Sequence, residues 1–243
     1  MAERLLHAQM LSWQRKPVLR NSIAEQKNST AVAEHVAGVL RDRIVKGELA
    51  ALDRIVERQL SAELNVSRTP IREALKLLEA DGLIDITLHR GAIVSDYKPQ
   101  DALSLFDVIS VLESLAAKRV CETITPSTLQ KLEDLHGTML EHHRAGRTND
   151  YFDHNTLIHD FIIQSCANPV LTTTHNRLMI RARRGRYLAI LNQARLEQAV
   201  AEHEDLMQAF RDGSTEKAAL VWETHLRHTG ETVAAVLLAE KAD

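Results

Sequence analysis

The sequence predicts a mainly helical protein in two parts: an N-terminal part with three helices and one short β-hairpin, and a C-terminal part made only of helices. Three observations predict this fold class. The composition favours helices, since only nine Gly and five Pro occur in 243 residues. Apolar residues recur at helical spacing along most of the chain. Strand-like alternation occurs once, shortly before residue 96, and is absent after it.

Length and composition are typical of a globular protein with two domains. Hydrophobic residues make up 44% of the chain and charged residues 26%, which allows a buried core and argues against a disordered or fibrous protein. Cys121 and Cys166 are too few for a disulfide framework or a thiolate zinc site. No apolar run approaches the ~20 residues of a membrane span, and the chain does not begin with a secretory signal. We therefore expect a cytoplasmic protein with no membrane segment.

Four segments are expected along the chain. Residues 1–29 are predicted to be a mobile N-terminal extension, with a short amphipathic helix as the alternative. Residues 30–96 form the first domain, residues 97–100 a linker, and residues 101–243 the helical domain.

The first domain has the pattern of a helix-turn-helix followed by a hairpin. Helices are predicted over residues 31–46, over residues 57–64, and from Ser67 as N-cap to a stop at Gly82. Asn65 tolerates the left-handed conformation that a tight turn between the last two helices needs. The alternation of Ile84, Ile86 and Leu88 before a turn predicts the hairpin. This order of elements is that of a winged helix-turn-helix, whose second paired helix enters the major groove of DNA.

The third helix carries candidate base-reading residues. Arg68, Thr69 and Arg72 lie opposite its apolar stripe at the N-terminal end, where residues of this motif reach base edges. Arginine can bond both acceptors of a guanine at once. The alternative is that the two arginines are solvated charges that pair with Glu73 or Glu79.

Further basic residues support DNA binding. Arg58 on the preceding helix can bind phosphate, and Arg90 with Gly91 at the hairpin tip can approach the backbone or minor groove. Residues 1–98 carry a net charge of +2 and residues 99–243 a net charge of −5. The basic half therefore contains the candidate DNA-binding surface.

At this point the sequence resembles a known family. Val56–Ser95 reads VERQLSAELNVSRTPIREALKLLEADGLIDITLHRGAIVS and is similar to the DNA-binding domain of the GntR family of bacterial regulators. Carried over residue by residue, the DNA-binding positions implied by the resemblance are Arg58, Ser67, Arg68, Thr69, Arg72, Arg90 and Gly91. The sequence departs from the family pattern at Leu52 and Asn65, where the pattern usually has Gly.

The C-terminal domain is predicted to be a bundle of about six helices, because turn signals such as Asn168-Pro169 and Asp212-Gly213 punctuate long helical stretches. It resembles the effector domain of the FadR branch of the family, known as the FCD domain. The resemblance rests on LFDVISVLESLAAKRV, NTLIHDFIIQSCANPVL and AEHEDLMQAFRDGSTEKAALVWETHLRH. Because this branch senses fatty-acid derivatives, sugar acids and di- or hydroxycarboxylates, the resemblance implies a small carboxylic-acid effector.

The resemblance also implies a divalent metal such as Zn²⁺ or Ni²⁺, with Asn155, His159, His203 and His225 as ligands. The spacing agrees, because Asn155 and His159 are four apart on one helix and the other two histidines lie on the last two helices. Asn155 replaces the Asp that metal-binding members most often carry, and an amide binds a cation more weakly. A metal-free polar pocket is the alternative. The histidines expected at the surface are His136, His142, His143 and His154.

A second departure concerns the effector's acid group. Many relatives carry an Arg four residues before the position of Glu113, where this chain has Ile109. Another cation must then bind the acid, and Arg177, Arg181 and Arg184 are available. We expect Arg181 to take this role.

Together these features predict a ligand-responsive repressor of catabolic genes that a small organic acid releases from DNA. Because one recognition helix covers only a few base pairs, we expect a homodimer on a palindromic operator. Two alternatives remain: a metal-dependent helical-bundle enzyme and an architectural DNA-binding protein without an effector. An enzyme is not expected, since the sequence lacks nucleophile, phosphate-loop and dinucleotide motifs.

Overall fold

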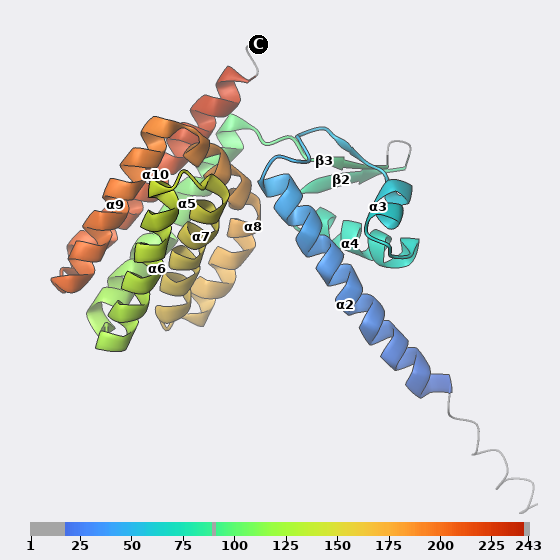
Figure 1. Ribbon diagram of the computed structural model, residues 1–243, viewed down its shortest axis with the longest axis horizontal. Coiled ribbons are helices and arrows are strands. Elements are labelled where there is room, and N and C mark those ends of the chain that lie inside the picture. Colours follow the sequence, from blue (N-terminus) through green and yellow to red (C-terminus); the bar gives the residue numbers. More distant parts are fainter. Residues whose placement is uncertain (1–17, 89–90, 241–243) are drawn as a thin grey trace, which may run out of the picture. The chain divides into compact units, whose positions relative to one another are not determined.

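The computed structural model describes residues 18–88 and 91–240, with side chains from Thr30 onward. This part of the chain divides into two compact units (Figure 1). The first unit contains the described chain up to Arg43 together with Leu52–Val94, and the second contains Ile44–Ala51 and the chain from Ser95. Within the described ranges, no helix is both long and apolar enough to span a bilayer.

Three helices lie in the described part of the first unit. They are α2 (Val18–Val45), α3 (Glu57–Glu63) and α4 (Arg68–Ala80). Helix α2 begins well before the predicted start at residue 31, so residues 18–29 are helical where a mobile extension was expected. The rest of that extension, residues 1–17, lies outside the described residues.

A small antiparallel sheet completes the first unit. Its strands are β1 (Arg54–Ile55), β2 (Ile84–Thr87) and β3 (Gly91–Val94), in the order β1-β3-β2. The hairpin β2–β3 was predicted, whereas β1 is too short to show a pattern. Of the alternating residues only Ile84 is buried, because Ile86 is 39% exposed and Leu88 is fully exposed. The outer part of the hairpin therefore contributes little to the core and has the exposure expected of a wing.

Two loop positions adopt the left-handed conformation. Asn65, between α3 and α4, has φ 52°, as the tight turn of the motif requires. Leu52 has φ 69°, a conformation that costs a leucine energy and that glycine adopts freely. Both positions are those at which the family pattern usually has Gly, so the resemblance extends to the backbone geometry.

The second unit consists of six helices, as predicted. They are α5 (Pro99–Thr123), α6 (Pro126–Arg144), α7 (Thr148–Ser165), α8 (Pro169–Leu191), α9 (Gln193–Arg211) and α10 (Thr215–Ala239). Thr125, Asn168 and Asn192 cap three of them by accepting a backbone N–H with the side-chain oxygen. Pro99 and Gln100, assigned to the linker by the sequence, already belong to α5.

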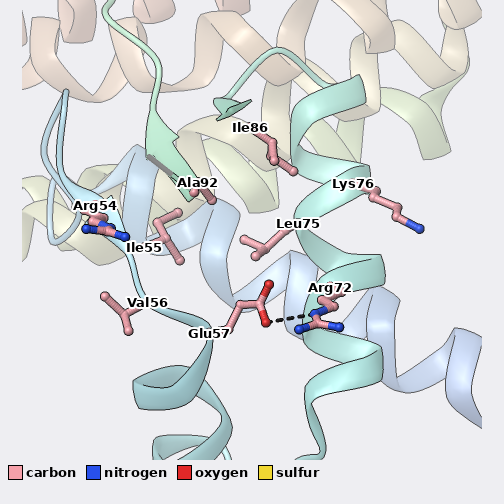
Figure 2. A pocket seen from close by; sticks show the side chains of 10 residues that line it. Arg54, Ile55, Val56, Glu57, Arg72, Leu75, Lys76, Ile86 and Ala92 are labelled. Atoms are coloured by element: carbon pink, nitrogen blue, oxygen red, sulfur yellow. Dashed lines mark hydrogen bonds and ion pairs between the residues drawn. The ribbon is translucent and has the colours of Figure 1, made fainter. Parts of the chain in front are cut away.

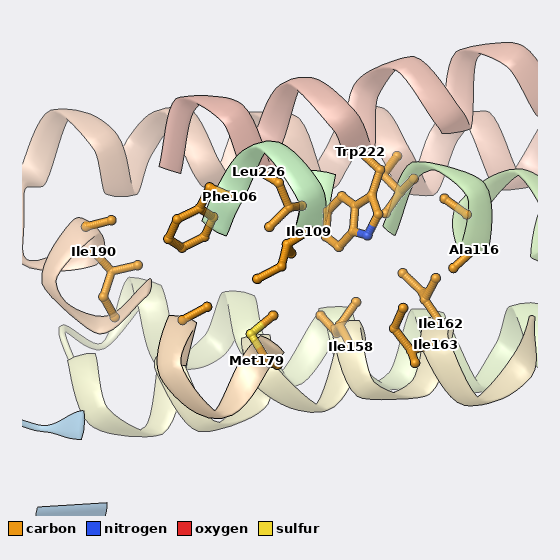
Figure 3. Close-up of a cluster of buried hydrophobic side chains, with 14 of the residues drawn as sticks. Phe106, Ile109, Ala116, Ile158, Ile162, Ile163, Met179, Ile190, Trp222 and Leu226 are labelled. Atoms are coloured by element: carbon orange, nitrogen blue, oxygen red, sulfur yellow. The ribbon is translucent and has the colours of Figure 1, made fainter. Parts of the chain in front are cut away.

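The core of the second unit is apolar and continuous. Figure 3 shows side chains from α5, α7, α8 and α10 that meet between the helices, among them Phe106, Ile158 and Trp222. Helices α5 and α10 approach each other closely at Gly230, where a Cβ atom would lie 2.6 Å from Cβ of Phe106. Any larger residue at position 230 would force the two helices apart.

Candidate functional sites

The residues predicted to read DNA lie on the exposed faces of α3 and α4 and in the turn before α4. The inner face of α4 buries Ile71, Leu75 and Leu78. The predicted contact residues on the outer side of α3, α4 and the turn before α4 are exposed: Arg58, Ser67, Arg68, Thr69 and Arg72. Ser67 has the extended backbone of an N-cap, although its side chain makes no capping hydrogen bond. A side chain that does not cap the helix is available to DNA.

Arg72 has a partner that the sequence analysis did not foresee. Its Nε donates to Glu57 Oε2 at 2.9 Å, as Figure 2 shows. The expected alternative partners are engaged elsewhere, because Glu73 pairs with Lys76 and Glu79 accepts the backbone N–H of Ile86. An exposed ion pair of this kind contributes at most about 1 kcal/mol, so it is weak enough to be exchanged for another anionic partner of Arg72.

A groove runs between α4 and the sheet. It has a volume of about 400 Å³ and is lined by Arg54, Ile55, Val56, Glu57, Arg72, Leu75, Lys76, Ile86, Gly91 and Ala92 (Figure 2). Three of these residues are basic and one is acidic, so the groove favours an anionic neighbour. Gly91 begins β3 with φ 73°. Arg90, the other predicted wing residue, lies outside the described residues.

The second site is a histidine centre inside the helical unit. His159 on α7, His203 on α9 and His225 on α10 each offer one ligand nitrogen, and these atoms all lie within 4.8 Å of one another. All three side chains are buried. The three histidines, which are far apart along the chain, thus lie together in the structure, as predicted.

In two of these imidazole rings, the nitrogen on the far side from the centre is hydrogen-bonded to a carboxylate. Glu113 on α5 accepts from Nδ1 of His159 at 2.5 Å, and Glu202 on α9 accepts from Nδ1 of His225 at 2.7 Å. Such bonds fix the tautomer and turn Nε2 toward the centre. Nε2 of His159 and of His203 is buried with no hydrogen-bond partner. Orphaned imidazole nitrogens facing one another are the donor set expected of a divalent transition metal.

Burial keeps the three imidazoles neutral. It lowers the pKa of His225 to about 4 and that of His159 to about 3. Burial and the neighbouring imidazoles also lower the pKa of His203 well below its usual value. Burial opposes ionisation of Glu202, but its hydrogen bond from His225 and the Arg195 charge outweigh burial and lower its pKa to about 2. Neutral imidazoles are the form that binds metal.

Asn155, the fourth predicted ligand, lies one turn before His159 on α7. It is buried, and its Oδ1 has no hydrogen-bond partner. It lines a cavity of about 10 Å³, enough for about one water molecule, together with Arg186, Ala189, Ile190, Arg195, Ala199, His225 and Thr229. An unpartnered amide oxygen at this place fits a ligand role.

Two arginines, Arg186 and Arg195, line this cavity, and neither was predicted from the sequence. The chosen residue, Arg181, is exposed on α8, as is Arg177. Arg186 is buried, and its Nη1 and Nη2 have no hydrogen-bond partner. A signal was present, because Arg186 continues the buried stripe of α8 through Met179 and Ala182.

Two further histidines, which were not expected in the core, are buried. His136 was expected at the surface but is buried, with its ring stacked 6.2 Å from that of His203. His175 was not singled out, yet it is buried and bonds Glu113 through Nε2 at 2.9 Å. The Trp222 ring stacks on His225 at 4.7 Å and completes the wall of the centre. His142, His143 and His154 are half-buried and do not reach it.

Comparison with known protein families identifies both units. Residues 32–94 match the model described as bacterial regulatory proteins, gntR family, and residues 104–228 match the FCD domain. The chain belongs to the GntR family of transcriptional regulators and carries an FCD effector domain. Regulators of this family bind operator DNA and typically dimerise.

Individual relatives agree with this assignment. The chain is 27% identical over 216 residues to the HTH-type transcriptional repressor RspR of Escherichia coli, which covers 87% of this chain and 93% of RspR. It is 24% identical to a probable D-xylose utilization operon transcriptional repressor of Paenarthrobacter nicotinovorans, over 82% and 87% of the two chains. The structure of E. coli McbR/YncC has the same fold, with a TM-score of 0.72 at 20% identity, over 86% and 98% of the two chains. The first two of these relatives are named as transcriptional repressors.

Proposed function

We propose that this regulator is a homodimeric repressor of catabolic genes that a small carboxylic acid releases from a palindromic operator. The observation that carries the proposal is the centre of three buried neutral histidines beside Arg186, whose two terminal nitrogens have no hydrogen-bond partner. Such groups lower the stability of a protein core, since buried polar atoms without partners cost free energy. A ligand that forms hydrogen bonds or metal-mediated bonds with these groups removes this cost, and the removed cost adds to its binding free energy.

A divalent metal such as Zn²⁺ or Ni²⁺ fits the histidine centre. His159, His203 and His225 would hold it through nitrogen, with Asn155 Oδ1 as the fourth ligand. When bound, the metal supplies open positions that a carboxylate can occupy. Glu113 and Glu202 keep the Nδ1 protons of two of the rings in place, so the rings face the centre before any ligand arrives.

Two arginines supply positive charge for the acid group. Arg195 is partly satisfied, because it pairs with Glu202 and donates to the backbone oxygen of His225 and to Thr229. Arg186 has no such bonds at its terminal nitrogens and is the stronger candidate. A guanidinium can bind both oxygens of a carboxylate at once. Arg186 thereby replaces the cation that is missing at Ile109.

Operator reading is tested by two arginine variants. Arg72→Ala is expected to weaken operator binding by about 1–3 kcal/mol and to relax the preference for one base pair. Arg58→Ala is expected to weaken binding to all sequences alike, because a phosphate contact carries no sequence information. Fluorescence anisotropy with operator and scrambled duplexes measures both. Equal, sequence-independent losses in the two variants would contradict the base-contact role of Arg72.

The sensing role is tested at the histidines. His203→Ala, alone or with His225→Ala, is expected to keep operator affinity near that of the wild type, to remove bound metal, and to abolish the response to the acid. The response at stake is about 5–150-fold in operator affinity, the usual range of allosteric coupling. Metal content by mass spectrometry and anisotropy titrations with a panel of organic acids are the measurements, with His154→Ala as the matched control.

The outcome of this test also separates the alternatives. A double variant that still leaves DNA at the wild-type acid concentration makes these histidines structural. A wild-type protein whose operator affinity and melting temperature no acid changes is an architectural DNA-binding protein.

A further inference from the structure

Tyr97 lies in the short segment between β3 and α5, yet its side chain belongs to the core of the helical unit. It follows Val94, the last residue of β3, by three residues and precedes Pro99, the first residue of α5, by two. Only 8% of Tyr97 is exposed, and its ring is part of the apolar core of the helical unit. The connecting segment is therefore fixed to the effector domain at this residue.

The Tyr97 ring packs against the backbone of α8 at Gly185. A Cβ atom at position 185 would lie 3.1 Å from both Cε1 and Oη of Tyr97 and 3.2 Å from Cε2 of Phe106. Contacts this close leave no gap, so a movement of α8 at Gly185 must displace one of the two rings. Phe106 is also held at its Cβ by the close approach of Gly230 on α10. The ring that can yield is therefore that of Tyr97.

The next residue along α8 is Arg186, which belongs to the proposed effector site. It is buried, it lines the cavity beside His225, and its terminal nitrogens have no hydrogen-bond partner. Consecutive residues of a helix point about 100° apart, so α8 presents the backbone of Gly185 to Tyr97 and the Arg186 side chain to the cavity. Because this part of α8 is closely packed, an acid that draws the Arg186 guanidinium toward itself also displaces the backbone at Gly185.

The packed position of Tyr97 is opposed by its own hydroxyl group. Tyr97 Oη is buried and has no hydrogen-bond partner. A buried hydroxyl without a partner costs free energy, and this cost offsets part of the gain from burying the ring. Tyr97 thus has two accessible arrangements, packed and released, and a modest displacement of α8 can shift the balance between them.

Release of Tyr97 lengthens the connection between the effector domain and the wing. While Tyr97 is packed, the chain from Val94 can extend at most about 10 Å before it is fixed to the helical unit. After release the chain is fixed first at Pro99, and the same connection can extend about 17 Å. Since β3 is a strand of the wing hairpin, the position of Tyr97 limits the freedom of the DNA-binding unit.

We propose that Tyr97 is a latch: packed against Gly185 it maintains the operator-binding state, and an acid bound at Arg186 releases it through α8. This inference rests on the proposed function, because it assigns the regulation of the same effector site. It supplies the step between acid binding and loss of operator affinity. The acid drives this step by binding the released arrangement more tightly than the packed one.

A methyl group at position 185 tests the latch in the absence of acid. In Gly185→Ala the new Cβ displaces Tyr97 from α8, so operator affinity is expected to fall about 5–150-fold, to that of the acid-bound wild type. Hydrogen exchange of the amides of residues 95–98, followed by mass spectrometry, is expected to accelerate by a similar factor. Fluorescence anisotropy measures operator affinity, and circular dichroism verifies folding.

Gly137→Ala is the matched control, because position 137 lies within α6 and a Cβ atom there has no neighbour within 4 Å. It is expected to match the wild type in operator affinity and in hydrogen exchange. A folded Gly185→Ala protein that behaves like Gly137→Ala in both measurements overturns the proposal.

Removal of the hydroxyl group tests the latch in the opposite direction. Tyr97→Phe keeps the ring and removes the unpartnered Oη, so the packed arrangement is favoured and about tenfold more acid is expected to be needed for half-release from the operator. Succinate, L-malate, D-gluconate and octanoate are the probes, titrated into the operator complex. A tyrosine with a merely structural role would leave this acid concentration unchanged, and that result also contradicts the latch.

The same titrations separate failure of the latch from failure of the proposed function. A wild-type protein that none of these acids releases contradicts the proposed function and removes the acid as the trigger of the latch, whatever Gly185→Ala does. A wild-type protein that acid releases, together with a Gly185→Ala protein that matches Gly137→Ala, supports the proposed function and refutes the latch alone.

Discussion

Acidification of the metal-free protein from about pH 7.5 to about pH 5 is expected to lower the free energy of unfolding of the helical unit by about 6 kcal/mol. The cause is the set of buried neutral histidines. Their pKa is about 4 for His225, about 3 for His159 and well below the usual value for His203, against 6.5 in an unfolded chain. Below pH 6.5 the unfolded state therefore binds more protons than the folded state. Stability is complete above this pH and is lost as the pH falls toward about 4.

The size of this loss of unfolding free energy follows from how steeply stability depends on pH. Each histidine that takes up a proton only on unfolding removes about 1.4 kcal/mol per pH unit. Urea unfolding followed by Trp222 fluorescence in a Trp13→Phe background measures it, because Trp222 stacks on His225. His203→Gln cannot take up that proton and is expected to reduce the loss by about a third. An unfolding free energy that stays constant down to about pH 5 would mean that the three rings are already charged or solvated.

Replacement of Arg186 is expected to act on stability and on sensing in opposite directions. Arg186→Met removes a buried charge whose terminal nitrogens have no partner and leaves an apolar side chain of similar length. Burial of the charge without hydrogen bonds at its terminal nitrogens is costly, and the attraction of the Glu113 and Asp160 carboxylates offsets only part of that cost, so the free energy of unfolding of the free protein should rise by about 1–3 kcal/mol. The same change should abolish release from the operator by carboxylic acids, since their acid group loses its cation.

The control for this variant lies on the same helix. Arg181→Met changes an exposed arginine and is expected to alter neither stability nor the acid response. Urea unfolding of the free protein and anisotropy titrations with acid measure the two effects. If Arg186→Met lowers the stability, or if the variant leaves DNA at the wild-type acid concentration, Arg186 has a structural role and the acid binds elsewhere.

The first unit was predictable from sequence nearly in full, because its signals are local. Asn65 in the turn, Pro70 in the first turn of α4 and the hairpin alternation each specify structure within a few residues. Partners distant in sequence were not predictable. The bond between Arg72 and Glu57 joins two helices, and only the packed structure shows that these side chains meet.

The histidine centre was half predictable. Family resemblance and spacing gave the three ring nitrogens, whereas Arg186, His175 and buried His136 depend on how six helices pack. A sequence shows the period of a helix better than which of its faces becomes buried. Arg181 was expected to bind the acid because it lies in an arginine-rich segment, whereas Arg186 on the buried stripe of the same segment was overlooked because a charged residue is usually exposed.

The close approach at Gly230 limits how the effector domain can move. Because the Phe106 side chain fills the place where a side chain at position 230 would lie, sliding α10 along α5 would drive backbone into an aromatic ring. The two helices can pivot about this point but cannot slip past it. His225 lies little more than one turn from Gly230 on α10, so we expect a ligand that displaces its ring to tilt α10 about this contact rather than to move the helix along its axis.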